Sequence, residues 1–140
     1  MYYDESNRGK IQFPERANQE IDFSGIKYRR ITPMDIDGMI EYHNKAFIFY
    51  EYKFGNAELP KGQRLAYERL VDKLQGEAAV LVCEHNVTDP SVAINGAEAL
   101  VREIYYHGKW WLQNRKRTAI QVTDAFINKV NKDLNNPNNW

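Results

Sequence analysis

The sequence is poor in several features that would point to a specific class of protein. Its 140 residues contain one cysteine, Cys83, so no disulfide can form within the chain. The mean hydropathy of −0.68 leaves no stretch for a membrane span of about 20 apolar residues. The N-terminal residues include no apolar signal region, which argues against secretion by the usual route and predicts a cytoplasmic protein. No His/Cys cluster indicates zinc, and no Gly-rich loop indicates nucleotide binding.

Net charge is also absent. The chain has 19 basic and 19 acidic side chains, whereas a protein that simply coats nucleic acid is usually strongly basic. The charges are unevenly placed, however. Residues 35–58 hold five acids against two lysines, and residues 102–132 hold seven basic side chains against two acids. An acidic pocket and a basic rim can therefore sum to zero, so the total charge excludes little.

The composition is that of a globular protein, with 43% hydrophobic and 27% charged residues. A chain of this size buries roughly 70% of its unfolded surface, so we expect residues 1–140 to form one domain with a core of its own. The expected parts are a flexible or peripheral start, a core, a hairpin with a C-terminal helix, and a frayed tail, at residues 1–13, 20–84, 99–134 and 135–140.

The hydrophobic pattern predicts a mixed α/β protein with helices packed against a sheet. A helix C-terminal glycine, Gly76, is expected to close the second helix. In chain order the expected elements are a short helix at 14–21, strands at 27–31, 39–42 and 46–54, a helix at 63–75, a strand at 78–83, strands at 99–106 and 109–112, and a helix at 119–134.

The strand expected at residues 46–54 ends with an acid and an amine on one face. Alternate residues of a strand share a face, so Glu51 and Lys53 point the same way, about 7 Å apart. Apart from these two residues, both faces of the strand are apolar. A strand buried on both sides should not end with two charges on one face unless a function uses them.

The turn before this strand decides which residue faces an earlier acid, Asp37. A three-residue loop centred on Asn44 places Asp37 opposite Glu51, whereas a loop centred on Lys45 places it opposite Lys53. A two-residue loop would put Asp37 on the wrong face, because a slip of one residue reverses every side chain. A functional role for the acid therefore requires an odd loop or a bulge.

Two carboxylates and a lysine at one strand edge suit the metal-assisted cleavage of a phosphodiester. Mg²⁺ binds oxygen ligands, keeps several waters and can bridge a phosphate. The metal polarises the phosphodiester and lowers the pKa of a bound water, while an ammonium positions that water or stabilises charge. The alternative interpretation is a surface Glu/Lys pair on an edge strand, with Asp35 and Asp37 as turn residues.

An acid, a hairpin, and then Glu-x-Lys on the second strand resemble the signature of the PD-(D/E)xK nuclease superfamily, here with Glu51 and Lys53. Asp35 and Asp37 compete for the first acid. We prefer Asp37, because its separation from Glu51 is closer to the spacing in the family and because Gly38 leaves room for a ligand.

The next expected helix strengthens the resemblance. Gln63 and Tyr67 match the Gln-x-x-x-Tyr motif of the branch that contains RecB and lambda exonuclease, and their i, i+4 spacing puts them on one helix face. Taken by themselves, they are better explained as a polar residue at a helix start and a half-buried aromatic, but their position after Glu-x-Lys, at the distance that the family shows, favours the motif. The resemblance covers about residues 20–84 and ends with the apolar strand at 78–83, which the family places beside the active-site hairpin.

The resemblance implies a restriction-endonuclease-like fold, with a mixed central sheet flanked by helices, and a nuclease that depends on Mg²⁺ or Mn²⁺. Asp37 and Glu51 would hold the metal, with Glu20 as a further candidate ligand, because the family often places a glutamate on its first helix. Compact members of the superfamily, such as junction resolvases and small phage or prophage endonucleases, are often dimers. The catalytic side chains would be Asp37, Glu51, Lys53 and Gln63, and Tyr67 would contact the DNA.

A basic and aromatic segment lies outside the resemblance. Two tyrosines and two tryptophans lie within or beside the basic part of residues 102–132, and such interleaving suits a surface that follows a DNA strand. An alternative interpretation has equal support: the basic residues form a solvated helix start, and the aromatic side chains of the neighbouring hairpin belong to the core. The candidates for DNA binding are Arg115, Lys116 and Arg117.

The sequence and its resemblance therefore predict a small Mg²⁺-dependent DNA nuclease without membrane contact, and the resemblance suggests a homodimer. Because a chain this short has little material for reading a base sequence, we expect it to recognise the structure or the ends of DNA. The main alternative keeps the fold without catalysis, as a module that binds nucleic acid or protein, such as a phage inhibitor of host defence.

Overall fold

A computed structural model describes residues 19–74 and 77–132, which fall into two compact units, Met1–Met34 and Asp35–Trp140. The expectation of a single domain stays a prediction. Most of the helix expected at 14–21 lies outside the described residues, and residues 19–21 are not helical.

The strand expected at residues 27–31 of the first unit is wrong. Tyr28 and Ile31 exchange two backbone hydrogen bonds of 2.9 Å and so close a four-residue turn. Arg29 within this turn has a φ of 59°, which is left-handed backbone and incompatible with an extended strand. The apolar residues here are exposed, so the alternation that predicted a strand faces no core among the described residues of this unit.

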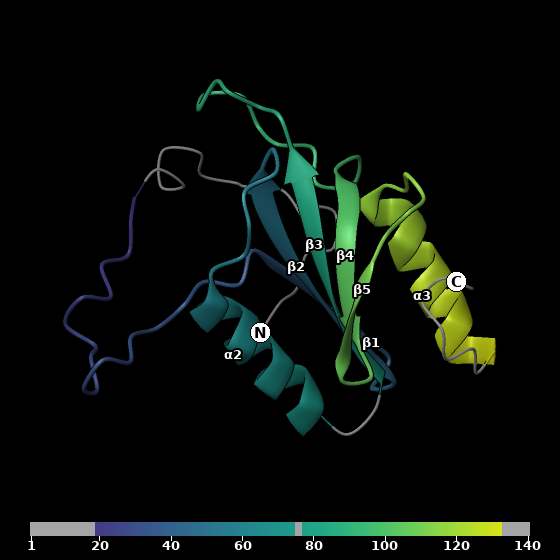
Figure 1. The fold of residues 1–140 in the computed structure, drawn as a ribbon, viewed down its shortest axis with the longest axis horizontal. Helices are drawn as coiled ribbons and strands as arrows, with labels where there is room; N and C mark the ends of the chain where they lie inside the picture. The colour runs from purple at the N-terminus through teal and green to yellow at the C-terminus, as the bar shows by residue number, and fades with distance from the viewer. Residues whose placement is uncertain (1–18, 75–76, 133–140) are drawn as a thin grey trace, which may run out of the picture. The chain divides into compact units, whose positions relative to one another are not determined.

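The described residues of the second unit form a five-stranded mixed sheet with two helices, which confirms the mixed α/β class (Figure 1). The strands lie in chain order, and β2 and β3 are parallel while every other neighbouring pair is antiparallel. Helix α2 (Lys61–Lys73) connects the two parallel strands, and α3 (Ala119–Lys132) follows the last strand. The strands are β1 (Gly38–Tyr42), β2 (Ala46–Phe54), β3 (Glu77–His85), β4 (Leu100–Tyr106) and β5 (Lys109–Leu112).

These bounds confirm seven of the expected elements, with shifts of a few residues at their ends. Helix α2 begins two residues earlier than expected, directly after Pro60, whose φ of −55° suits a helix start. It ends at Lys73, with Leu74 as the C-cap in extended conformation. Gly76, which was expected to close this helix, lies outside the described residues, as does the tail at 135–140.

The two helices cover opposite faces of the sheet (Figure 1). Helix α3 packs Val122 and Phe126 into a core formed by alternate residues of the strands, such as Ile48, Leu81 and Ile104. Helix α2 contacts the intervening residues, which face the other way. Strand β3 is central and buried on both faces, which explains its continuous apolar run at 78–83.

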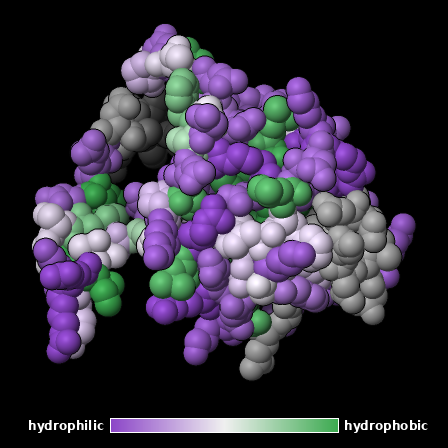
Figure 2. Space-filling model, viewed as in Figure 1, coloured by the Kyte–Doolittle hydropathy of each residue, from purple (hydrophilic) through white to green (hydrophobic). Residues whose placement is uncertain are grey.

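The surface carries no continuous apolar band on the side drawn in Figure 2, where hydrophobic side chains are scattered among hydrophilic ones. Within residues 19–74 and 77–132, neither helix is long and apolar enough to cross a membrane.

Candidate active site

The hairpin of β1 and β2 has the register that places Asp37 opposite Glu51. Its turn consists of residues 43–45 and is centred on Asn44, and Gly38 pairs with Tyr50. The turn closes because His43 and Asn44 adopt left-handed backbone, with φ of 46° and 59°. Continued by one residue, this register brings Asp37 across from Glu51, so the loop centred on Asn44 is confirmed over the one centred on Lys45.

Glu51 is the centre of a buried polar cluster between β2 and α2. The residue is 4% exposed, and its carboxylate accepts a hydrogen bond of 2.6 Å from the Tyr67 hydroxyl. The other carboxylate oxygen lies 3.4 Å from the Lys53 ammonium. Lys53 also donates to the Gln63 side-chain oxygen at 3.4 Å. The strand and the helix therefore bring four of the predicted site residues into one connected network.

Asp37 lies at the open edge of the sheet, just before β1. Its carboxylate accepts a hydrogen bond of 2.8 Å from the backbone N–H of Tyr52, so it occupies the position that a longer β1 would fill. Asp37 is exposed, unlike Glu51. Burial raises the pKa of the Tyr67 hydroxyl, and the hydrogen bond and charge of Glu51 and then the charge of Asp37 raise it further. Both carboxylates thus act on one hydroxyl, which stays protonated as a donor.

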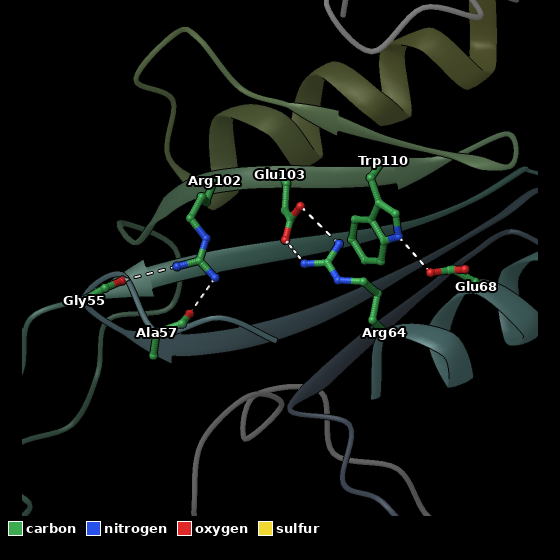
Figure 3. Close-up of polar contacts among 7 residues, drawn as sticks. All are labelled: Gly55, Ala57, Arg64, Glu68, Arg102, Glu103 and Trp110. Carbon is green, nitrogen blue, oxygen red and sulfur yellow. Dashed lines mark hydrogen bonds and ion pairs between the residues drawn. The ribbon is translucent and has the colours of Figure 1, made fainter. Parts of the chain in front are cut away.

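Helix α2 is fixed to the sheet by a second polar network, which sequence reasoning missed (Figure 3). Arg64 donates to both carboxylate oxygens of Glu103 at 2.6 and 3.3 Å, and its guanidinium lies 4.3 Å from the ring centre of Trp110. Trp110 in turn donates to Glu68 at 3.0 Å. Arg64 adjoins Gln63 in the helix, so these contacts set the position from which Gln63 reaches Lys53.

A β-bulge in β4 adds a contact to the loop before α2. Val82 pairs with Glu103 but Cys83 pairs with Val101, so Arg102 is the extra residue. Its guanidinium donates to the backbone oxygen of Ala57 at 2.7 Å and to that of Gly55 at 3.5 Å (Figure 3). The bulge therefore turns Arg102 toward the loop that leads from β2 into α2.

Only some side chains of the basic segment, residues 102–132, lie on the surface. Lys129 is 1% exposed, pairs with Glu77 at 2.9 Å and contacts the Tyr106 hydroxyl, so it belongs to the core. Arg102 donates to the backbone oxygens of Gly55 and Ala57. Tyr105 is also buried, and its hydroxyl donates to Asp72 on α2 at 2.9 Å. The interpretation that the aromatic side chains belong to the core is therefore confirmed for Tyr105 and Tyr106.

The three predicted DNA-binding residues, Arg115, Lys116 and Arg117, lie in the loop between β5 and α3. The first two are exposed, and Arg117 is half-buried and donates to Gln113 at 3.0 Å. The strand directions put this loop at the same end of the sheet as Lys53. Two strands lie between β2 and β5, which corresponds to about 14 Å across the sheet, so the loop is beside the cluster and not part of it.

Of the three predicted metal ligands, the hairpin brings two together, Asp37 and Glu51. Glu20 belongs to the first unit, so its role as a third metal ligand stays a prediction. In the part of the chain that the structure describes, no three His, Cys, Asp or Glu side chains form a group that could hold a metal ion. A metal at this hairpin would therefore take two carboxylates of this unit and complete its shell with water or substrate.

A scan against models of protein families and searches of curated proteins and of solved structures each found no match. The function of the cluster is therefore inferred from its chemistry.

Proposed function

We propose that the protein is an Mg²⁺- or Mn²⁺-dependent DNA nuclease of the PD-(D/E)xK type, with a restriction-endonuclease-like fold. The observation that supports this most is the hairpin register, which sets Asp37 opposite Glu51. The Glu51 carboxylate also contacts the Lys53 ammonium. A coincidental surface pair would not be 4% exposed at Glu51, nor would it be joined to the Gln63 and Tyr67 side chains of the following helix.

The donor set fits a magnesium ion. Mg²⁺ is commonly bound through one or two carboxylates and keeps several waters, so Asp37 and Glu51 suffice as protein ligands. Among the described residues, one Glu51 oxygen contacts Tyr67 and the other contacts Lys53, and each retains a second lone pair toward this part of the chain. Asp37 is exposed and accessible to an incoming phosphate. When bound, the metal would polarise the phosphodiester and acidify a water.

Lys53 is placed to act on the attacking water or on developing charge. Its side chain is 20% exposed, between the buried Glu51 carboxylate and solvent, so its ammonium can reach both. Gln63 accepts a hydrogen bond from Lys53 through Oε1, which leaves the amide nitrogen as a donor for a phosphate oxygen. Tyr67, which the resemblance assigns to DNA contact, is fully buried and holds Glu51 in place through its hydroxyl.

The substrate is DNA recognised by its structure or its ends. The exposed Arg115 and Lys116 lie at the same end of the sheet as Lys53, where they would attract the phosphate backbone. A homodimer and a phage or prophage origin belong to the same proposal, by resemblance to compact members of the superfamily.

The test is cleavage of single-stranded, branched and linear duplex DNA in Mg²⁺ or Mn²⁺ by the wild type and by Lys53→Ala. Removing one charge-stabilising group costs on the order of 100-fold or more in rate, so Lys53→Ala should be almost inactive. The matched control is Lys45→Ala, since Lys45 is an exposed lysine in the turn of the same hairpin and should leave the rate unchanged. No metal-dependent cleavage of any substrate by the wild type would overturn the proposal.

The alternative is a binding module for nucleic acid or protein on the same fold, such as a phage inhibitor of host defence. One observation favours it: Glu51, Lys53 and Gln63 pair with one another and so also satisfy the demands of a purely structural network. DNA binding that is retained without cleavage, and is insensitive to Lys53→Ala, would support this alternative.

A further inference from the structure

A hollow of about 310 Å³ adjoins the candidate active site. It is lined by Asp37, Tyr52, His85, Ile94 and Gly96. Tyr52 lies between Glu51 and Lys53 in the chain, so its side chain points to the face of the sheet opposite to theirs. Asp37 is shared: its carboxylate is opposite Glu51 in the hairpin and also forms part of the wall of this hollow.

The hollow is built by Tyr52 and the loop between β3 and β4. The Tyr52 backbone N–H binds Asp37 at 2.8 Å, and its hydroxyl donates to the Gly96 backbone oxygen at 3.1 Å. A Cβ at position 96 would lie 2.8 Å from the Tyr52 hydroxyl oxygen, so only glycine allows the loop to approach this closely. Burial raises the pKa of the Tyr52 hydroxyl to about 12, so it remains a donor to the loop at neutral pH.

The lining favours a neutral, flat ligand with N–H groups over an anion. Asp37 contributes a negative charge, which opposes a phosphate within the hollow itself. Tyr52 offers an aromatic surface and Ile94, which is 44% exposed, an apolar one. His85 accepts the Val87 backbone N–H at Nδ1, so Nε2 is the ring nitrogen that can donate to a ligand. The volume is that of a small ligand site.

We propose that this hollow binds the base of the nucleotide next to the scissile phosphate. The inference rests on the proposed nuclease function and deepens it. A phosphate held at Asp37 and Glu51 would place the adjoining sugar and base beside Asp37, which also lines the hollow. A base can enter only when it is unpaired and unstacked, so the substrate is a single strand or a frayed end rather than an intact duplex.

The test measures binding separately from cleavage. Lys53→Ala protein is titrated with single-stranded oligonucleotides that carry one abasic site, placed at successive positions. Base stacking on an aromatic ring implies that one abasic position weakens binding by about 5-fold or more, whereas the others are tolerated. Wild-type cleavage of the same series should lose rate at the position next to the cut. A uniform response at all positions would overturn the inference.

A pair of variants locates the effect. Ile94→Glu places a carboxylate in the hollow, and Ile120→Glu places the same charge on α3 at a residue of similar exposure, 43%. Only Ile94→Glu should abolish the position-dependent response, and it should do so at low and at raised salt, because exclusion of the base is not long-range repulsion. An equal effect of the two variants would contradict the assignment.

The outcomes also separate this inference from the proposed function. Cleavage with no preferred abasic position leaves the nuclease standing and overturns the base site. A preferred position in binding, without cleavage of any substrate by the wild type, leaves the base site standing and overturns the nuclease.

Discussion

The hydrogen bond from Tyr67 to Glu51 allows a quantitative test of the buried cluster that does not depend on catalysis. Tyr67→Phe removes only the hydroxyl, whose 2.6 Å bond to the carboxylate joins two residues that are 0% and 4% exposed. A hydrogen bond to a charged group contributes about 1.5–3 kcal/mol, and the carboxylate would remain buried with one donor fewer. We therefore expect Tyr67→Phe to lower the free energy of unfolding by about 2 kcal/mol, a factor of roughly 30 in the folding equilibrium.

Urea unfolding with linear extrapolation measures this change. Tyr42→Phe is the matched control, because the Tyr42 hydroxyl accepts a longer, exposed hydrogen bond of 3.3 Å from Asn131, and its loss should cost less than about 0.5 kcal/mol. A double-mutant cycle with Glu51→Gln should give a coupling of about 1 kcal/mol or more between Glu51 and Tyr67. Equal effects of the two Tyr→Phe variants, or no coupling, would refute the reasoning.

The same variant has a pH signature. The folded state raises the pKa of Tyr67 above its ordinary value of 10.0, through burial first and Glu51 next. Above pH 10 the unfolded state therefore binds fewer protons than the folded state, and stability falls as the pH rises. Because Tyr67→Phe removes this group, the variant should lose less stability than the wild type between neutral pH and pH values above 10.

Two further predictions concern other buried groups. Arg64→Lys keeps the charge but loses the bidentate contact with Glu103 and the stacking on the Trp110 indole, so it should lower the free energy of unfolding by about 1–2 kcal/mol in urea unfolding. Arg69→Lys, at an exposed residue of the same helix, is the control and should change this free energy by less than about 0.5 kcal/mol. Equal effects of the two variants would contradict the role of the network. Burial raises the pKa of the Cys83 thiol to about 12, so Cys83 should resist thiol reagents at pH 8 in the folded protein and react once urea unfolds it; rapid reaction of the folded protein would contradict its burial.

Local patterns in the sequence predicted the part of the site that depends on neighbouring residues. The hairpin and the spacing of Glu51 and Lys53 are properties of a few consecutive residues. The loop that aligns Asp37, centred on Asn44, was one of the alternatives that the sequence left open, and the structure decides between them. The helix face shared by Gln63 and Tyr67 follows from helical periodicity in the same way. The burial of β3 on both faces was likewise predictable from its uninterrupted apolar run, whereas its parallel pairing with β2 was not predicted.

Contacts distant in sequence could not be predicted in this way. Arg64 and Glu103 are 39 residues apart, and the neighbouring Arg102 is the extra residue of a bulge that shifts the register of β4 by one residue. Lys129 reads as a solvated charge on an amphipathic helix, yet Glu77 at the start of β3 makes it a buried ion pair. Each of these positions is set by the assembled sheet rather than by local propensity.

The most direct test of the proposed function compares Asp37→Asn with Asp35→Asn, which remove the same charge from two exposed residues of one segment. Only Asp37 contacts β2 opposite Glu51 among these two acids. With single-stranded DNA and Mg²⁺, Asp37→Asn should lose on the order of 100-fold or more in cleavage rate, while Asp35→Asn should cleave at the wild-type rate. Wild-type cleavage by Asp37→Asn would contradict the assignment of the metal site to this hairpin.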